Sequence, residues 1–139
     1  IGITSMKLAT EEIEGMGFAI PINDVKNYVT YLEKGEEIKR PSIGISVINT
    51  SDRYSLYMNN ISVNTSETGV VIAKVESGCS AEKAGLKKGD VITKFDDNKV
   101  TSISTLRYYL YQYKTGDTIK VTYIRDGKEN TLDMKLIEK

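Results

Sequence analysis

Residue types that carry out covalent or metal chemistry are scarce in this chain. Its 139 residues include no histidine and a single cysteine, Cys79. Without histidine the chain cannot form a Ser-His-Asp or Cys-His nucleophilic site, and it offers no imidazole to a metal. One cysteine also excludes an intramolecular disulfide and any CxxC zinc or redox motif. We therefore expect no catalytic residue, cofactor or metal site here, and we interpret Cys79 as a structural thiol.

Two weaker routes to chemistry also lack support. Glu11, Glu12 and Glu14 fall in an expected loop, and their spacing does not match metal-ligand geometry. A Ser/Lys dyad would need a motif to place its two members together, and none is present. An enzyme is therefore the weakest of the function classes open to this chain.

Composition and charge describe a folded domain without the signature of a nucleic-acid partner. Apolar residues make up 40% of the chain and charged residues 27%, which favours a globular fold over disorder. Nineteen basic and nineteen acidic side chains cancel, so the basic patch of a nucleic-acid binder is not expected. No apolar run approaches the roughly 20 residues that span a bilayer, and no membrane contact by this chain is expected.

The distribution of charge predicts a boundary near Pro41. Residues 1–40 contain five basic and seven acidic side chains, whereas 41–139 contain fourteen and twelve. We predict an N-terminal piece over 1–39 and a main domain over 40–139.

The N-terminal piece is expected to hold two strands and a helix. The strands fall over residues 1–4 and 15–22, and a helix capped by Asn23 runs to Gly35. Because so few elements cannot bury their own apolar faces, we interpret this piece as the tail of a larger domain. The helical spacing is given by Val25, Tyr28, Val29 and Leu32.

The main domain is predicted to be mostly strands with two helices. Asp126-Gly127 is a strong hairpin turn signal, and before it Ile119, Val121 and Tyr123 alternate on one face of a strand. Gly85 is placed to end the short helix, at a position where a positive φ is favourable. A further short helix over 52–58 is only weakly indicated. The strands are expected over 44–48, 69–75, 90–95, 118–125 and 131–137, and the helices over 81–84 and from a cap at Ser102 or Ser104 to about Tyr113.

Residues 75–92 resemble the most recognisable segment of bacterial-type PDZ domains. The shared pattern is small-Pro-Ala-x-x-Ala-Gly-Leu-x-x-Gly-Asp-x-Ile, and it appears here from Ser80 to Ile92, with Ser80 in place of the usual proline and Cys79 as a second departure. The order of elements over 69–137 also matches. The resemblance implies a mainly β fold with two helices, a PDZ-type partly open β-sandwich or barrel.

The same resemblance implies a peptide-binding groove. Residues 40–45 fall where a PDZ domain keeps its carboxylate-binding loop, whose backbone N–H groups form a nest for a peptide C-terminus. The peptide would pair as an extra strand along Ile45 to Val47. Arg40 and Arg107 are candidates for steering the carboxylate, although exposed charges are often only solvated. The implied peptide-binding residues are Ser42, Ile43, Gly44, Ile45, Ser46, Val47, Leu106, Tyr109 and Leu110, with Ile103 as a further possible neighbour of Leu106 on the helix.

Some of these residues have an alternative role. Leu106 and Leu110 can equally belong to the core, and Ser42 stands where many relatives have a bulky residue. Four tyrosines between Tyr108 and Tyr113 cannot all face inward on one helix, so some must be exposed or rim the groove.

Residues 15–22 resemble the Gly-x-Gly-Phe-Ala-Ile-Pro signature near the C-terminal end of HtrA/Deg-type serine protease domains, and residues 1–4 look like the strand before it. The resemblance implies a remnant of a chymotrypsin-like domain whose catalytic residues lie before residue 1. It also implies a trimeric, extracytoplasmic parent protease, membrane-tethered by a segment upstream.

Our leading hypothesis is a module that recognises peptide C-termini or unfolded segments by strand addition and regulates proteolysis by its parent. This chain itself would not be an enzyme. The alternative is a structural domain that positions protease subunits or docks a partner without binding peptide. Whether isolated peptides bind distinguishes the two.

Overall fold

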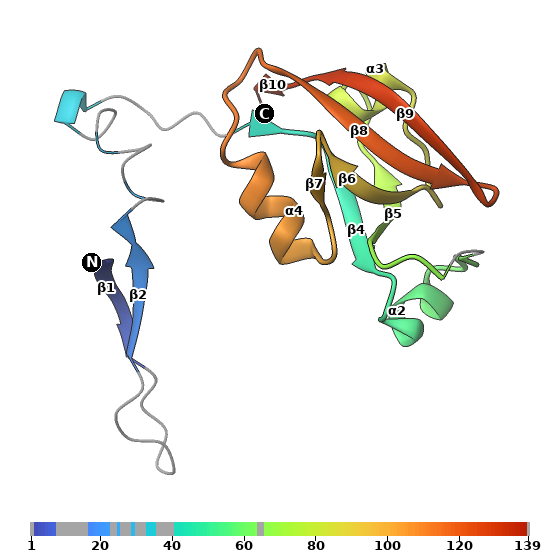
Figure 1. Ribbon diagram of the computed structural model, residues 1–139, viewed down its shortest axis with the longest axis horizontal. Coiled ribbons are helices and arrows are strands. Elements are labelled where there is room, and N and C mark those ends of the chain that lie inside the picture. The colour runs from blue at the N-terminus through green and yellow to red at the C-terminus, as the bar shows by residue number, and fades with distance from the viewer. Residues whose placement is uncertain are drawn as a thin grey trace, which may run out of the picture. The chain divides into compact units, whose positions relative to one another are not determined.

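The computed structural model describes residues 2–7, 17–22, 25, 29, 33–35, 41–63 and 66–138 (Figure 1). The chain divides into two compact units, Ile1–Ile38 and Lys39–Lys139. The predicted helix from Asn23 falls largely outside the described residues, as do the acidic residues 11–14 and Arg40.

In the first unit, the described residues form an antiparallel pair of strands. β1 (Gly2–Lys7) pairs with β2 (Gly17–Pro21), from Gly2 opposite Pro21 to Lys7 opposite Gly17, with an irregularity between Thr4 and Met6. Both predicted strands are present, and β1 continues three residues past the predicted end at Thr4. β2 ends at Pro21, which has no N–H to donate to a ladder.

The second unit is built on an antiparallel sheet in the order β4-β5-β6-β8-β9, with β7 paired to β6 (Figure 1). β4 lies at one edge of this sheet, and its inner neighbour is β5. The strands are β4 (Ile45–Asn49), β5 (Val70–Val75), β6 (Val91–Phe95), β7 (Asn98–Lys99), β8 (Thr118–Arg125) and β9 (Lys128–Lys135).

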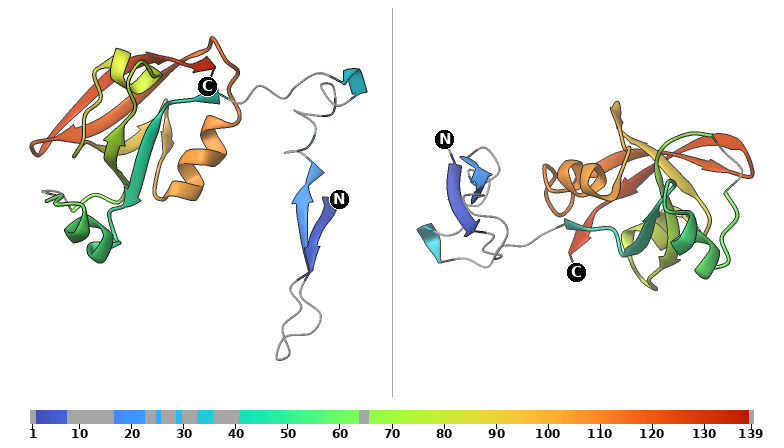
Figure 2. Two further views of the ribbon diagram at one scale, coloured as in Figure 1. Left: turned by 180° about the vertical axis from the view of Figure 1, so that it is seen from behind. Right: turned by 90° about the horizontal axis from the view of Figure 1, so that it is seen from below.

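A second, two-stranded sheet joins the two ends of this unit. β3 (Pro41–Ser42) pairs antiparallel with β10 (Ile137–Glu138), with Ser42 opposite Ile137. The short pairing fixes the chain just before β4, and Figure 2 shows it from two further sides. Its position matters for the loop that follows.

The described part of the second unit has three helices rather than the two predicted. α2 (Arg53–Met58) is the weakly indicated one, and the Asp52 side chain caps it by accepting a hydrogen bond from the Ser55 N–H. The other two helices are α3 (Ser80–Ala84) and α4 (Ile103–Leu110).

α4 begins as predicted and ends three residues earlier than predicted. The Ser102 hydroxyl accepts a hydrogen bond from the Thr105 N–H, as an N-cap does. The N–H groups of Gln112 and Tyr113 bond three residues back, to Tyr109 and Leu110, so the chain tightens into turns there. The Tyr113 hydroxyl donates to Asp96 in the turn after β6, and this tertiary contact holds the altered path.

Two apolar clusters cover opposite faces of the sheet. Alternate residues along the strands explain the division, since successive side chains point to opposite faces. α4 packs on the larger cluster through Leu106 and Leu110, and α2 packs on the smaller one through Leu56. Among the described helices, none is long and apolar enough to cross a membrane.

Candidate functional site: the groove between β4 and α4

A groove of about 420 Å³ lies between the edge strand β4 and helix α4. Its floor is apolar, because Leu106 and Leu110 project from one side of α4 toward β4 and the loop before it. One end is closed by that loop. The lining residues are Pro41, Ser42, Ile43, Gly44, Ile45, Ser46, Val47, Glu76, Ile103, Leu106, Arg107, Leu110 and Tyr111.

The loop before β4 turns three consecutive carbonyl groups toward the chain between Glu76 and Ala81. The carbonyl of Ser42 accepts from the Ser80 hydroxyl at 3.2 Å, and that of Ile43 accepts from the Ala81 N–H at 3.1 Å. The Gly44 carbonyl accepts from the Glu76 N–H at 2.9 Å and from the Cys79 thiol at 3.4 Å. All three peptide units are therefore held from the same side.

The orientation of these carbonyls fixes where the neighbouring N–H groups point. No cis peptide bond occurs in the described residues, and in a planar trans peptide the carbonyl of one residue is opposite the N–H of the next. The N–H groups of Ile43, Gly44 and Ile45 consequently point away from the segment that holds the carbonyls. No described residue accepts a hydrogen bond from the N–H of Ile43 or Gly44. The loop thus presents consecutive backbone donors, which suits an anion such as a carboxylate.

Gly44 is required by the conformation and the packing of the loop. Its φ is +68°, in the left-handed region that favours glycine. A Cβ placed on Gly44 would lie 2.2 Å from the Cβ of Cys79, closer than any two carbons can pack. The loop and the start of α3 therefore touch through backbone and the cysteine side chain, with no room for a larger residue.

The edge position of β4 gives the groove its second property. Ile45 lies opposite Val75, and the hydrogen bond next to this pair joins the Glu76 N–H to the Gly44 carbonyl. The N–H and carbonyl of Ile45 itself therefore point away from β5. An edge strand with unpaired backbone groups is a template for another strand. An extended segment lying in the groove can therefore pair with β4 while one of its ends reaches the loop.

The apolar residues of the groove are also part of the core. Leu106 is 4% exposed and Leu110 is 6% exposed, and Ile43 is buried beside them in the same cluster. The two roles considered for the leucines are thus both met, since each packs on the core with one surface and lines the groove with another. A wall fixed in this way forms a pocket before any ligand arrives.

Of the other predicted residues, the structure brings Ser42, Ser46, Val47 and Arg107 into the lining. Tyr109 is placed elsewhere: it is half-buried against the core, with its ring edge-on to that of Tyr108 at 5.4 Å.

Sequence reasoning missed three lining residues, which are Pro41, Glu76 and Tyr111. Tyr111 could have been found from Arg107, because residues four apart share one face of a helix. Glu76 follows β5 directly opposite the loop, a placement that only the strand register reveals. With Arg107 and Glu76 on the rim, charge of both signs borders an apolar floor.

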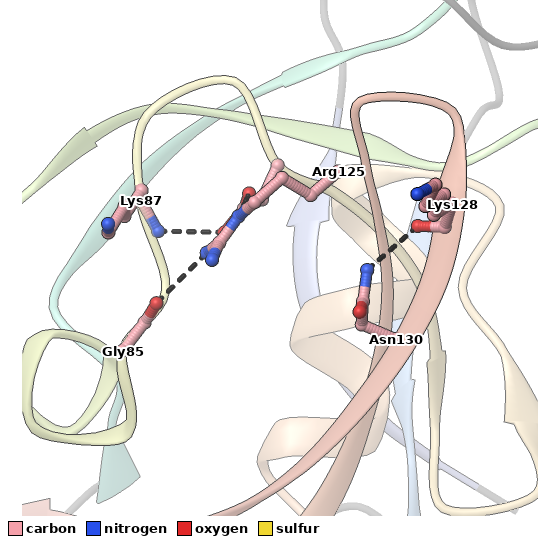
Figure 3. Close-up of polar contacts among 6 residues, drawn as sticks. Gly85, Lys87, Arg125, Lys128 and Asn130 are labelled. Carbon is pink, nitrogen blue, oxygen red and sulfur yellow. Dashed lines mark hydrogen bonds and ion pairs between the residues drawn. The ribbon is translucent and has the colours of Figure 1, made fainter.

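An ion pair between the buried Asp90 and the partly exposed Arg125 supports α3 and so the chain that holds the loop (Figure 3). Arg125 donates from Nε to Asp90 at 2.7 Å, and a second guanidinium nitrogen reaches both Asp90 and the carbonyl of Gly85. The N–H of Lys87 completes the set by donating to Asp90. These hydrogen bonds to the carboxylate raise the pKa of Arg125 above its ordinary value. These contacts therefore fix the conformation of the Ala-Gly-Leu…Gly-Asp motif, which begins at the end of α3.

No group of three or more potential metal ligands occurs among the described residues. What the site can do chemically is bind: it combines backbone donors at one end, an unpaired strand edge along one side and an apolar wall along the other. This combination of features can accommodate an extended segment as an added strand.

Comparison with known proteins identifies the family of this domain. Residues 41–136 match the family model described as PDZ domain, and the chain belongs to the PDZ domain family.

The resemblance to HtrA-type serine proteases is confirmed by similar proteins. The chain is 47% identical over 98% of its length to the serine protease Do-like HtrA of Lactococcus lactis subsp. lactis. It is 40% identical over its whole length to the serine protease Do-like HtrA of Bacillus subtilis. The chain spans about a third of these relatives, 35% and 32% of their lengths.

Solved structures give the same fold. The HtrA-type protease AlgW with decapeptide matches with a TM-score of 0.76 at 20% identity, over all of this chain and 42% of that one. The serine endoprotease from Yersinia pestis matches with a TM-score of 0.67 at 25% identity, over 99% of this chain and 43% of that one. The predicted mainly β, PDZ-type architecture is confirmed.

Proposed function

We propose that the groove binds the C-terminus of a peptide or an unfolded protein segment, which adds as a strand to β4. The observation behind this proposal is the arrangement of the loop, where carbonyls engaged from one side leave the N–H groups of Ile43, Gly44 and Ile45 directed to the other. A terminal carboxylate accepts hydrogen bonds from such donors, and the last side chain enters the pocket walled by Leu106 and Leu110.

The module would serve a larger protein. We propose that the parent is an HtrA-type serine protease acting outside the cytoplasm as a trimer, with its catalytic residues upstream of this chain, and that peptide binding regulates proteolysis. Support comes from the relatives that are named serine protease Do-like HtrA. The segment that matches this chain makes up about a third of their length. A structure of one neighbour, the AlgW protease, is described as containing a decapeptide.

Calorimetric titration with two forms of one peptide tests the binding role. A short apolar peptide ending in valine should bind with a dissociation constant on the order of micromolar, equivalent to roughly −8 kcal/mol. The same peptide with an amidated C-terminus should bind at least about tenfold more weakly, because it lacks the charged acceptor. Equal affinity for the two forms would contradict carboxylate recognition. Binding of neither form would favour a structural or partner-docking role instead.

A further inference from the structure

Ser80, behind the loop, is nearly inaccessible to solvent, at 2% exposed. Its hydroxyl donates to the Ser42 carbonyl at 3.2 Å and accepts from the Ile137 N–H at 2.9 Å. Ser42 and Ile137 are themselves opposite one another in the β3–β10 pair. One buried hydroxyl therefore joins the loop, the start of α3 and the last strand of the unit.

A hydroxyl is suited to this connection because it both donates and accepts. A serine oxygen donates once and accepts through its lone pairs, so it can satisfy a carbonyl and an N–H at the same time. Proline, which the resembling pattern has at this position, offers no side-chain donor or acceptor. The departure from the pattern at Ser80 thus adds two hydrogen bonds at the point where the loop begins.

The neighbouring residues engage the loop in the same direction. Ala81 donates to the Ile43 carbonyl through its N–H, and Cys79 donates to the Gly44 carbonyl through its thiol. Residues 79–81, which we call the α3 clamp, therefore engage the carbonyls of residues 42–44. Ser80 is the member of the clamp whose side chain also bonds β10, and its hydroxyl can be removed without altering the backbone.

We propose that Ser80 is a positioning residue for carboxylate recognition, and this inference rests on the function proposed above for the groove. By holding the Ser42 carbonyl, the hydroxyl sets the plane of the Ser42–Ile43 peptide unit, so that the Ile43 N–H faces the groove. By holding Ile137, it ties that orientation to β10. Ser80 does not touch the peptide and acts only through the loop.

The binding energy of a peptide has two parts, strand pairing with β4 and hydrogen bonding of the carboxylate by the loop. Pairing with β4 is available to a free-acid peptide and to its amide alike, whereas the loop donors favour the carboxylate. A variant that merely destabilises the domain leaves the ratio of the two affinities unchanged in folded molecules. A variant that turns the loop donors away lowers that ratio.

The test measures the dissociation constants of the valine-ended peptide and its amide for the 139-residue chain and three variants. Ser80→Ala should weaken binding of the acid by about tenfold and of the amide by less than about twofold. Ser80→Thr, which keeps the hydroxyl, should recover the ratio to within about threefold. Thr93→Val is the matched control, because it removes another buried hydroxyl that bonds a carbonyl, that of Thr122, away from the groove.

The outcomes separate this proposal from the one on which it rests. If the unaltered chain does not prefer the acid, carboxylate recognition fails and the role of Ser80 fails with it. If the unaltered chain prefers the acid and Ser80→Ala keeps the full preference, only the role of Ser80 is overturned. Should Ser80→Ala not fold, Ser80→Cys replaces it: its thiol is a weaker donor, so the ratio should fall by about threefold, and an unchanged ratio would overturn the proposal.

Discussion

Two parts of the PDZ unit turn the chain sharply with glycine and anchor it with polar groups, yet they use those groups differently. At the Asp90–Arg125 pair, the guanidinium and the Lys87 N–H both donate to the Asp90 carboxylate, so donors and acceptor are paired within the domain. At the loop of residues 42–44, the carbonyls are engaged from within while the N–H groups that follow them are directed outward. Polar groups that are all paired within the domain stabilise the fold. A loop in which only the carbonyls are paired leaves N–H donors that can bind a ligand.

The largest effect on stability is expected at the closed site. Asp90→Ala removes a carboxylate that is almost fully buried, leaves the Lys87 N–H without its acceptor and leaves Arg125 with the Gly85 carbonyl alone. We expect the free energy of unfolding to fall by about 3 kcal/mol, as measured by urea denaturation. Asp97→Ala, at an exposed position after β6, is the control and should change it by less than about 0.5 kcal/mol. If Asp90→Ala instead abolished the acid-over-amide preference in folded molecules, the contrast between the two sites would fail.

Gly44→Ala should affect both stability and binding. The new Cβ meets Cys79 and the residue keeps a positive φ, so we expect a loss of about 2 kcal/mol of unfolding free energy. Affinity for the free-acid peptide should fall by about tenfold or more in molecules that remain folded. Gly116→Ala is a useful comparison, since Gly116 also has a positive φ, at +100°, and nothing lies within 4 Å of its Cβ position. It should lose stability and keep peptide affinity; a loss of affinity there would show that backbone strain alone disturbs the groove.

A smaller, pH-dependent effect is expected at Tyr113, another internally paired group. Burial first, and then the hydrogen bond to Asp96, raise the pKa of Tyr113 to about 12. Because the folded-state pKa lies above the unfolded value near 10, this stabilisation is complete below about pH 10 and is lost as the pH rises through about 12.

Tyr113→Phe should therefore lower the unfolding free energy by about 1 kcal/mol at neutral pH, and the difference from the unaltered chain should disappear at the high end of that range. Denaturation curves at several pH values measure it. Tyr108→Phe, at an exposed ring, should match the unaltered chain throughout. A difference for Tyr113→Phe that persists above pH 12 would contradict the assignment of the hydrogen bond.

The smallest effect is expected from Arg107, an exposed charge on the rim of the groove. Arg107→Ala should weaken the free-acid peptide by less than about threefold, because an exposed charge acts mainly on the rate of encounter. The change should appear in the association rate and vanish at high salt, as seen by stopped-flow fluorescence of a labelled peptide. A loss of tenfold that resists salt would place Arg107 in direct contact with the carboxylate.

Local patterns predicted much of the fold. The alternation at Ile119, Val121 and Tyr123 placed these three side chains in the core, where all are buried. Gly85 was predicted as the residue that ends the short helix, and it has a φ of +90° as the C-cap of α3. Each of these inferences depends on a period or a turn that a few adjacent residues determine.

Contacts between distant residues could not be predicted in the same way. The β3–β10 pair is only two residues long and joins the two ends of the unit, so no periodic pattern in the sequence predicts it. The partner of Asp90 is Arg125, on a strand whose register had to be known first. The end of α4 was misplaced because the tyrosines after Leu110 suit a helix and the contact with Asp96 is tertiary.

For the groove, the PDZ-like motif was sufficient to bring most of the proposed residues together. The tyrosines show where the pattern fails: Tyr109 and Tyr111 are two positions apart on one helix, which rotates by about 200° between them. The prediction extended the groove face of the helix to Tyr109, beside Leu106, whereas the structure extends it to Tyr111, beside Arg107.

The central claim is that the N–H groups of Ile43, Gly44 and Ile45 are the donors that recognise a carboxylate. Amide proton spectra of the isotopically labelled chain, recorded during titration with the valine-ended peptide and with its amide, test it directly. We predict that the free acid shifts the amide signals of these three residues strongly downfield, and that the amidated peptide leaves them nearly unchanged while still perturbing the rest of β4, residues 46–49. Equal shifts with both peptides, or shifts confined to another surface of the domain, would contradict the account.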